Sequence, residues 1–221
     1  MSETEVIQKG LARDYVETIL VCVIFVMFAR AFVFQQSKIP TGSMEDSLLP
    51  GDYIIVDRTA YAPTSFDWES RLHPGGRAER GDVIVFKYPL EPEVDYIKRV
   101  IGVPGDIVQV RDDGVHVNGK LLDEPYVAER YRIGNVPTRP VRVADGHLFV
   151  MGDHRNDSLD SRYWGQVPQA LVKGRAVVIW WSFPENDGAR PSAGQRFRTW
   201  GRKISGFFTR TRWNRCLKRI Q

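Results

Sequence analysis

Short apolar runs separated by turn-forming residues constrain the fold of this chain more than any other feature of its sequence. Representative runs are Tyr53–Val56, Asp82–Phe86 and Tyr96–Ile101, each bounded on at least one side by Gly or Asp. Runs of this length, rich in Val, Ile and aromatic residues, are typical of β-strands and too short for packed helices. Residues 35–185 are therefore predicted to form a mainly β domain with antiparallel sheets.

Two tight turns support this interpretation. Asp112-Asp113-Gly114 separates two apolar runs, and Asn118-Gly119 follows the second of them. Asp-Gly and Asn-Gly pairs favour the two-residue turns of β-hairpins. We therefore expect a hairpin-containing insertion over residues 107–145. Strands are also expected at 147–151 and 176–181, and a surface loop rich in Pro, Gly and charge at 58–80.

The N-terminal region contains one long apolar segment. Thr18 to Ala29 carries no charge and is almost wholly apolar. The stretch 15–34 supplies the roughly 20 helical residues needed to cross a hydrocarbon core of about 30 Å, with Glu17 and Arg30 near its two ends. We therefore predict one transmembrane helix over residues 15–34, preceded by a short N-terminal segment, 1–14.

A cleavable signal peptide is the main alternative for this segment. Its apolar run has the length of the central region of such a peptide, and Ala29-Arg30-Ala31 matches the small-x-small cleavage pattern. The acidic Glu17 before the run and the apolar residues after the triplet favour the anchor instead. Basic residues are nearly balanced on the two sides of the segment, so charge does not fix its orientation.

The tail, residues 186–221, is basic and aromatic. From Gln195 onward the chain carries nine Lys and Arg and no Asp or Glu, whereas the preceding residues carry 22 basic and 27 acidic side chains. Such a tail suits contact with membrane lipid, although a solvated tail fits equally well; no nucleic-acid partner is expected. Cys22 and Cys216 lie in the apolar segment and in the tail, so no disulfide is expected.

Three blocks of sequence carry candidate chemistry. Ser43 lies in Pro40–Met44, Lys98 lies in Asp95–Asp106, and a densely charged block spans Met151–Gly165. A serine hydroxyl is a weak nucleophile until a base takes its proton, and lysine can be that base only when neutral. Apolar neighbours on a strand would lower the lysine pKa from its usual value of about 10.4, while Arg99 would lie on the opposite face.

In this order and spacing, the three blocks closely resemble the type I signal peptidases of bacteria. The resemblance extends from about residue 15 to about residue 183. It implies a serine endopeptidase with a Ser-Lys dyad that removes signal peptides from exported preproteins after small-x-small motifs. It also implies the catalytic fold shared with self-cleaving repressors, and a single-pass protein of the bacterial cytoplasmic membrane with its catalytic domain on the extracytoplasmic side.

The resemblance implies roles for individual residues. Ser43 and Lys98 would be catalytic, and the Thr41 hydroxyl with the Ser43 N–H would bind the oxyanion. Ser158 would orient the lysine, with Asp160 and Arg162 behind it. Small-residue specificity would come from two shallow pockets lined by Ile39, Met44, Leu48, Ile54, Val85, Tyr96 and Ile97, although several of these could equally be core residues.

Alternative interpretations remain open from sequence alone. A Ser-His-Asp triad would use His154, which lies beside Asp153 and Asp157, but adjacent residues on a strand point in opposite directions. No His or Cys pair has metal-ligand spacing, so neither a metal nor another cofactor is expected. Two rival functions remain. One is a processing peptidase for a single pilus or conjugation substrate, and the other is a non-enzymatic membrane protein with a lipid-binding tail. Nothing in the sequence demands more than a monomer.

Overall fold

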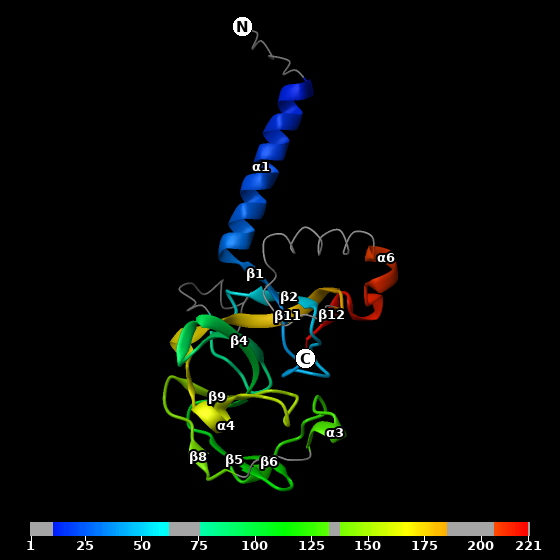
Figure 1. The fold of residues 1–221 in the computed structure, drawn as a ribbon. Coiled ribbons are helices and arrows are strands. Elements are labelled where there is room, and N and C mark those ends of the chain that lie inside the picture. Colours follow the sequence, from blue (N-terminus) through cyan, green and yellow to red (C-terminus); the bar gives the residue numbers. More distant parts are fainter. Residues whose placement is uncertain (1–10, 62–75, 133–137, 185–205, 221) are drawn as a thin grey trace.

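A long helix projects from a β domain in the computed structural model, which describes residues 11–61, 76–132, 138–184 and 206–220 (Figure 1). The helix, α1, spans Leu11–Phe32 and leads almost directly into strand β1, Phe34–Lys38. The expected membrane segment extended to Phe34, but Phe34 pairs with Asp57 in the sheet. Within the described residues, no helix combines the length and apolar character needed to cross a membrane.

The larger sheet contains eight strands among the described residues, in the order β1-β2-β11-β3-β4-β9-β10, with β12 paired to β11. All of its pairings are antiparallel, as the sequence predicts. Its further strands are β2 Asp52–Asp57, β3 Val83–Tyr88, β4 Glu91–Gly102, β9 His147–Met151, β10 Val167–Pro168, β11 Val172–Ser182 and β12 Lys218–Arg219.

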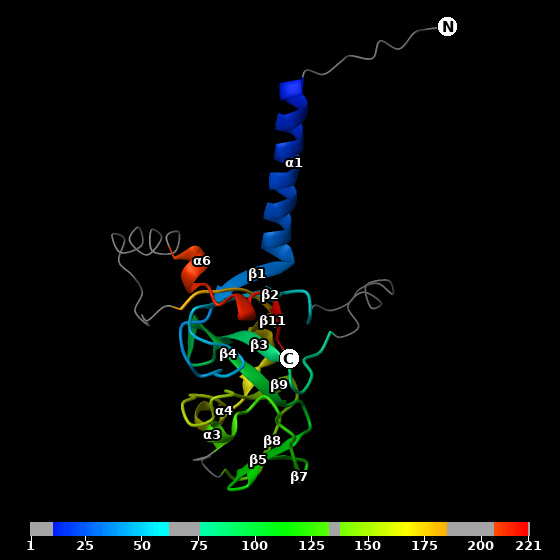
Figure 2. The same cartoon turned by 90° about the vertical axis from the view of Figure 1, so that its right-hand side faces the viewer.

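A smaller sheet forms the end of the domain away from α1 (Figure 2). Its described strands run in the order β7-β6-β5-β8, with bounds β5 Ile107–Arg111, β6 Gly114–Val117, β7 Lys120–Leu121 and β8 Val141–Arg142. Both expected hairpins are present. Asn118 and Gly119 have φ values of 53° and 80°, which suit a turn that needs positive φ at two successive positions.

Short helices occupy the connections between strands. They are α3 Glu129–Arg132, α4 Ser161–Trp164, the 3₁₀ turn η1 Gln169–Leu171, α6 Phe207–Arg210 and the 3₁₀ turn η2 Trp213–Arg215. The central part of the expected surface loop 58–80, residues 62–75, lies outside the described residues.

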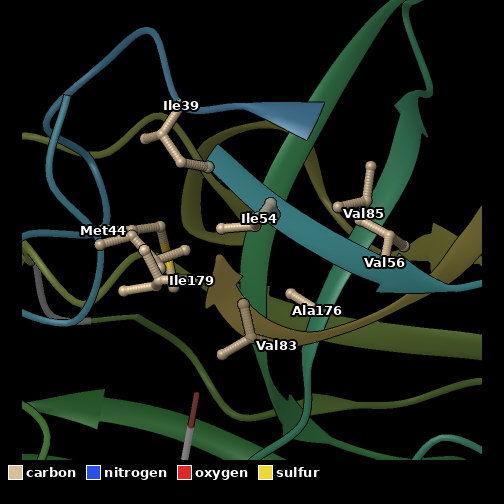
Figure 3. Packing of buried hydrophobic residues seen from close by; sticks show 9 residues of the cluster. Ile39, Met44, Ile54, Val56, Val83, Val85, Ala176 and Ile179 are labelled. Atoms are coloured by element: carbon tan, nitrogen blue, oxygen red, sulfur yellow. The ribbon is translucent and has the colours of Figure 1, made fainter. Parts of the chain in front are cut away.

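Three groups of buried apolar side chains form the core. The first packs the 39–48 segment against β2, β3 and β11 (Figure 3). The second joins β4 and β9 to the smaller sheet, through residues such as Ile101, Phe149 and Val108. The third includes Phe86, Val100 and Val150 of the larger sheet. Strand β4 contributes to the second and third groups, so its position is fixed from both faces.

The last part of the basic tail is folded onto the larger sheet, which neither sequence interpretation of the tail anticipated. In β12, Lys218 and Arg219 pair with Ile179 and Val178 of β11. Ile220 packs against the first group of core residues. Residues 206–220 are therefore a structural part of the β domain, while residues 185–205 lie outside the described chain.

Gly102 offers a sharp test of packing between the two sheets. A Cβ added there would lie 2.5 Å from Val108 Cγ2 and 3.0 Å from Val143 Cγ2. We expect Gly102→Ala to lower the free energy of unfolding by about 1–3 kcal/mol, because the core is overpacked. In a Val108→Ala background, which removes the nearest methyl group, the same substitution should cost clearly less in denaturant titrations. Equal costs in the two backgrounds would contradict this packing.

Candidate active site

Ser43 and Lys98 meet in the structure although 55 residues separate them in sequence. Lys98 Nζ donates a hydrogen bond to Ser43 Oγ at 2.7 Å and another to the carbonyl oxygen of Ile97 at 2.9 Å. Lys98 lies on β4, where it pairs with Ile84 of β3. Ser43 lies in the turn between β1 and β2. A hydroxyl and an amine thus share one short hydrogen bond, the arrangement that base-assisted nucleophilic catalysis requires.

The side chain of Lys98 is buried, with 4% of the residue exposed. Burial disfavours the charged ammonium and lowers the pKa of Lys98 from 10.5 to about 8, although the nearby carboxylates of Asp160 and Asp153 act in the opposite direction. The Arg162 guanidinium helps to lower this pKa. About one tenth of Lys98 is therefore neutral at pH 7, far more than for an ordinary lysine, and the lowered pKa has the direction that the apolar surroundings of β4 predicted.

The backbone of Ser43 is held by the segment that follows β9. His154 N donates to the Ser43 carbonyl oxygen at 3.2 Å. A Cβ on Gly152 would lie 2.4 Å from that same oxygen and 2.2 Å from Ser158 Oγ. Only glycine therefore allows the 152–158 segment to approach the turn so closely, and this requirement gives no distinctive signal in a single sequence.

Asp160 organises the charged block behind the dyad. Its buried carboxylate accepts hydrogen bonds from Ser158 Oγ at 2.7 Å, Gly152 N at 2.9 Å and Arg162 Nε at 2.8 Å. It also accepts from the Arg162 backbone N–H and so caps helix α4. The structure thus joins Ser158, Asp160 and Arg162 in one cluster. The hydroxyl of Ser158 donates to Asp160, so its expected role toward Lys98 stays a prediction.

A second buried ion pair fixes the face of β4 opposite Lys98. Arg99 donates to both carboxylate oxygens of Asp153, at 2.9 Å and 2.7 Å, and to Ser47 Oγ at 3.2 Å. Both side chains are at most 1% exposed. Paired burial satisfies both charges and links β4, the 153–162 segment and the turn that contains Ser43. Sequence reasoning placed Arg99 on the strand face opposite Lys98 but could not show that Asp153 is its partner.

One strong pair of the site was not anticipated at all. Arg155 donates to both carboxylate oxygens of Glu124, and its Nε donates to the Gly152 carbonyl oxygen at 3.0 Å. Both residues are buried. Glu124 follows β7 within the 107–145 insertion, where the sequence predicted only hairpins, so its partner could not be identified locally.

Of the two expected oxyanion donors, the Thr41 side chain is open to solvent. Thr41 is exposed, and Gly42 separates it from Ser43. A Cβ at Gly42 would lie 2.7 Å from the Glu45 carboxylate, so the turn is compact at this point. This placement leaves the Thr41 side chain accessible to a bound molecule, and its role stays a prediction.

Most of the expected pocket-lining residues are buried. Ile39, Met44, Leu48, Ile54 and Val85 are each at most 2% exposed and belong to the first core group, as Figure 3 shows for four of them. Tyr96 and Ile97 are partly exposed on β4, beside Lys98. The two β4 residues thus keep part of their surface open to solvent, the other five belong to the buried core, and a substrate-binding role for all seven stays a prediction.

The alternative triad does not form. Asp153 forms its ion pair with Arg99. The centroid of the His154 ring lies 3.8 Å from that of the Tyr131 ring, and His154 Nδ1 lies 3.8 Å from Glu45 Oε2. The hydroxyl partner of Ser43 is Lys98. Among the residues that the structure describes, no cluster of three His, Cys, Asp or Glu could hold a metal ion.

Comparison with known proteins identifies close relatives. The family model described as "Signal peptidase, peptidase S26" matches residues 12–181. The chain is 34% identical to signal peptidase I of Pseudomonas aeruginosa, over 80% of this chain and 75% of that protein. It is 39% identical to probable signal peptidase I-2 of Synechocystis sp., over 76% and 72% of the two chains. A crystal structure of a signal peptidase I from Enterococcus faecalis V583 is 37% identical, with a TM-score of 0.40 over 45% of this chain and 96% of that one.

The lowered pKa of Lys98 predicts a specific pH dependence of stability. Between pH 8 and 10.5 the unfolded chain holds the proton on Lys98 more tightly than the folded chain does, so stability gains from rising pH. Lys98→Met removes this contribution. From pH 7 to 11, the unfolding free energy of the wild type should therefore rise by about 3 kcal/mol relative to that of Lys98→Met. Urea titrations at several pH values measure this difference, and parallel curves would show that the lysine keeps its ordinary pKa.

Proposed function

The chain belongs to the signal peptidase family, peptidase S26, and we propose that Ser43 is its nucleophile and Lys98 its general base. The protein is accordingly a serine peptidase that removes signal peptides from preproteins. The interpretation as a catalytically silent membrane protein is therefore wrong. The observation that supports the assignment of this dyad is the 2.7 Å hydrogen bond between the buried Lys98 amine and the Ser43 hydroxyl.

The dyad supports acyl transfer in two steps. Neutral Lys98 Nζ takes the proton of Ser43 Oγ, which attacks the carbonyl carbon of the scissile peptide. The resulting ammonium then donates its proton to the leaving amine, and an acyl-enzyme on Ser43 remains. In the second step Lys98 takes a proton from water, the hydroxide attacks the ester carbonyl, and the proton returns to Ser43 as the acyl group leaves.

The oxyanion of each tetrahedral intermediate needs donors that are already in place. The N–H of Ser43 and the hydroxyl of Thr41 are the proposed donors. The carbonyl of Ser43 accepts a hydrogen bond from His154 N, which restrains the peptide that follows the nucleophile. Exposure of Thr41 leaves its hydroxyl free to meet a substrate that enters from solvent.

The charged cluster behind Lys98 is proposed to maintain the lysine in its reactive state. Asp160 alone would raise the pKa of Lys98, while the adjacent Arg162 opposes that effect. Their bidentate pairing, with Nε at 2.8 Å and Nη2 at 2.9 Å, keeps both charges in fixed positions. Asp160 accepts a hydrogen bond from Ser158 Oγ at 2.7 Å within this cluster, and Ser158 is proposed to orient the lysine.

Specificity for small residues is proposed to be steric. Ile97 and Tyr96 offer partly exposed apolar surface next to the dyad. The buried residues Ile39, Met44, Leu48, Ile54 and Val85 form a packed floor that leaves little depth for a side chain. A shallow apolar site excludes large side chains because they would overpack it.

The described part of α1 falls short of the length and apolar character of a membrane span, but its exposed apolar side chains lead us to propose that it anchors the enzyme in the bacterial cytoplasmic membrane as a single span, with the β domain outside the cytoplasm. Apolar side chains from Tyr15 to Phe28 are exposed on all sides of α1. At its N-terminal end Arg13 and Glu17 neutralise each other at 2.8 Å. Exposed apolar surface of this kind favours lipid over water.

A second lipid contact is proposed for the tail. Phe208 and Trp213 are 80% and 51% exposed, and Phe207 packs against both rings. Helix α6 lies on the side of the β domain from which α1 departs (Figures 1 and 2). Aromatic side chains favour the interface between lipid and water, so this placement suits a membrane surface.

Cleavage of a preprotein tests the dyad. The purified chain in detergent should cut after the small-x-small motif. Ser43→Ala and Lys98→Met should each lower the rate at least about 10³-fold, because each removes a group that forms or breaks bonds. The wild-type kcat/KM should rise about tenfold per pH unit below an apparent pKa of about 8 and level off above it. His154→Ala is the matched control and should retain activity; its loss would favour the histidine mechanism.

Charged substitutions test the anchor. Leu20→Arg with Ile24→Arg places two charges in the centre of α1, each of which costs about 2.5–3.5 kcal/mol in a membrane span. This variant should leave the membrane fraction in an alkaline wash, whereas the wild type and an Arg13→Gln control at the helix end should remain. In spheroplasts the wild-type β domain should be open to added protease. Retention of the double variant would show that α1 does not anchor the chain.

A further inference from the structure

The C-terminal segment reaches the turn that carries Ser43. Residues 206–220 lie beside β2 and β11 in both views (Figures 1 and 2). Arg212 N donates to Ser182 O at 2.9 Å and Ile220 N donates to Val177 O at 3.1 Å. These two bonds hold η2, which lies between them in sequence, against the edge of the larger sheet. The segment therefore gives its side chains fixed positions.

Arg215 of this segment forms a buried ion pair with Asp52. Its Nη2 donates to Asp52 Oδ2 at 2.6 Å, and the two side chains are 12% and 0% exposed. Asp52 also accepts from Leu49 N at 2.8 Å and from Ser182 Oγ at 2.6 Å. A buried carboxylate without a cationic partner is strongly unfavourable, so the position of Asp52 depends on Arg215.

The same guanidinium extends further toward the nucleophile. Arg215 Nη2 donates to the Ser47 carbonyl oxygen at 2.9 Å, while Arg99 donates to the Ser47 hydroxyl at 3.2 Å. Two arginines from distant parts of the chain thus hold one residue of the turn. Ser47 is followed by Leu48, whose N–H donates to Met44 O at 2.7 Å, next to Ser43.

The turn is consequently restrained at both ends. Near Ser43 it is held by His154 N, and near Asp52 it is held by Arg215 and by Arg212, which donates to Pro50 O at 2.6 Å. A displacement of about 1 Å at a reacting group can lower a rate about 10²-fold. The position of the nucleophile is therefore sensitive to contacts made by the tail.

We propose that Arg215, which the C-terminal segment 206–220 holds in place, is a positioning residue of the active site, because it holds the 43–52 turn so that Ser43 meets Lys98. This inference rests on the proposed role of Ser43 as the nucleophile. It assigns a function in catalysis to a tail whose composition indicated only a lipid surface or a solvated segment.

Arg215→Met tests this role, with Arg219→Met as the matched control because Arg219 is exposed on the adjacent strand β12. We expect Arg215→Met to lower kcat about 10-fold or more while KM changes less than about twofold, since the substrate site on β4 is untouched. Amides of residues 43–52 should exchange with deuterium faster in this variant. Arg219→Met should match the wild type in both measurements. Equal behaviour of the two variants would overturn the proposal.

Asp52→Asn combined with Arg215→Met separates positioning from stability. The double variant removes the unpaired carboxylate, so its melting temperature should return most of the way to the wild-type value. It still lacks the bond to Ser47, so kcat should remain low. Recovery of kcat together with the melting temperature would show a structural role only and overturn the proposal. Hydrogen exchange does not require catalysis, so it reports on Arg215 even if Ser43 proves not to be the nucleophile.

Discussion

Burial of Lys98 against Ser43 is the constraint on which the rest of the structure depends. In the proposed mechanism, the amine must lose most of its contact with water to become a base, yet it must keep its 2.7 Å hydrogen bond to the hydroxyl. Strand β4 achieves this because it is paired on both edges, to β3 and β9, and packed on both faces. The lysine therefore cannot move toward solvent without disturbing the centre of the sheet.

Charged residues around the dyad are buried in complementary pairs, which allows a dense polar site inside an apolar fold. Arg162 with Asp160, Arg99 with Asp153, and Arg215 with Asp52 each leave little exposed charge. Each pair also contacts the backbone of a neighbouring segment. The three pairs join β4, the 152–162 segment and the C-terminal segment around the turn that carries Ser43, so catalytic geometry and fold stability share the same contacts.

The strand pattern and both hairpins could be predicted because they depend on local alternation and on turn dipeptides such as Asn118-Gly119. Ser43 and Lys98 could be selected as candidates because three short blocks occur in a recognisable order, and the structure brings the two side chains within hydrogen-bond distance. The arginine partners of Asp52 and Glu124 could not be predicted. They lie 163 and 31 residues away in sequence, and nothing local distinguishes a buried arginine from an exposed one. For the same reason the tail was expected either at a lipid surface or in solvent, and its pairing with β11 was not foreseen.

The most direct measurement is an NMR titration of the Lys98 side-chain nitrogen in protein labelled with ¹⁵N-lysine, with Lys98→Met used to assign the signal. We expect a midpoint at about pH 8, because burial lowers the pKa of this amine. Such a result would show directly that Lys98 can act as a base toward Ser43 near neutral pH. A midpoint near 10.5, the ordinary value for lysine, would contradict the mechanism.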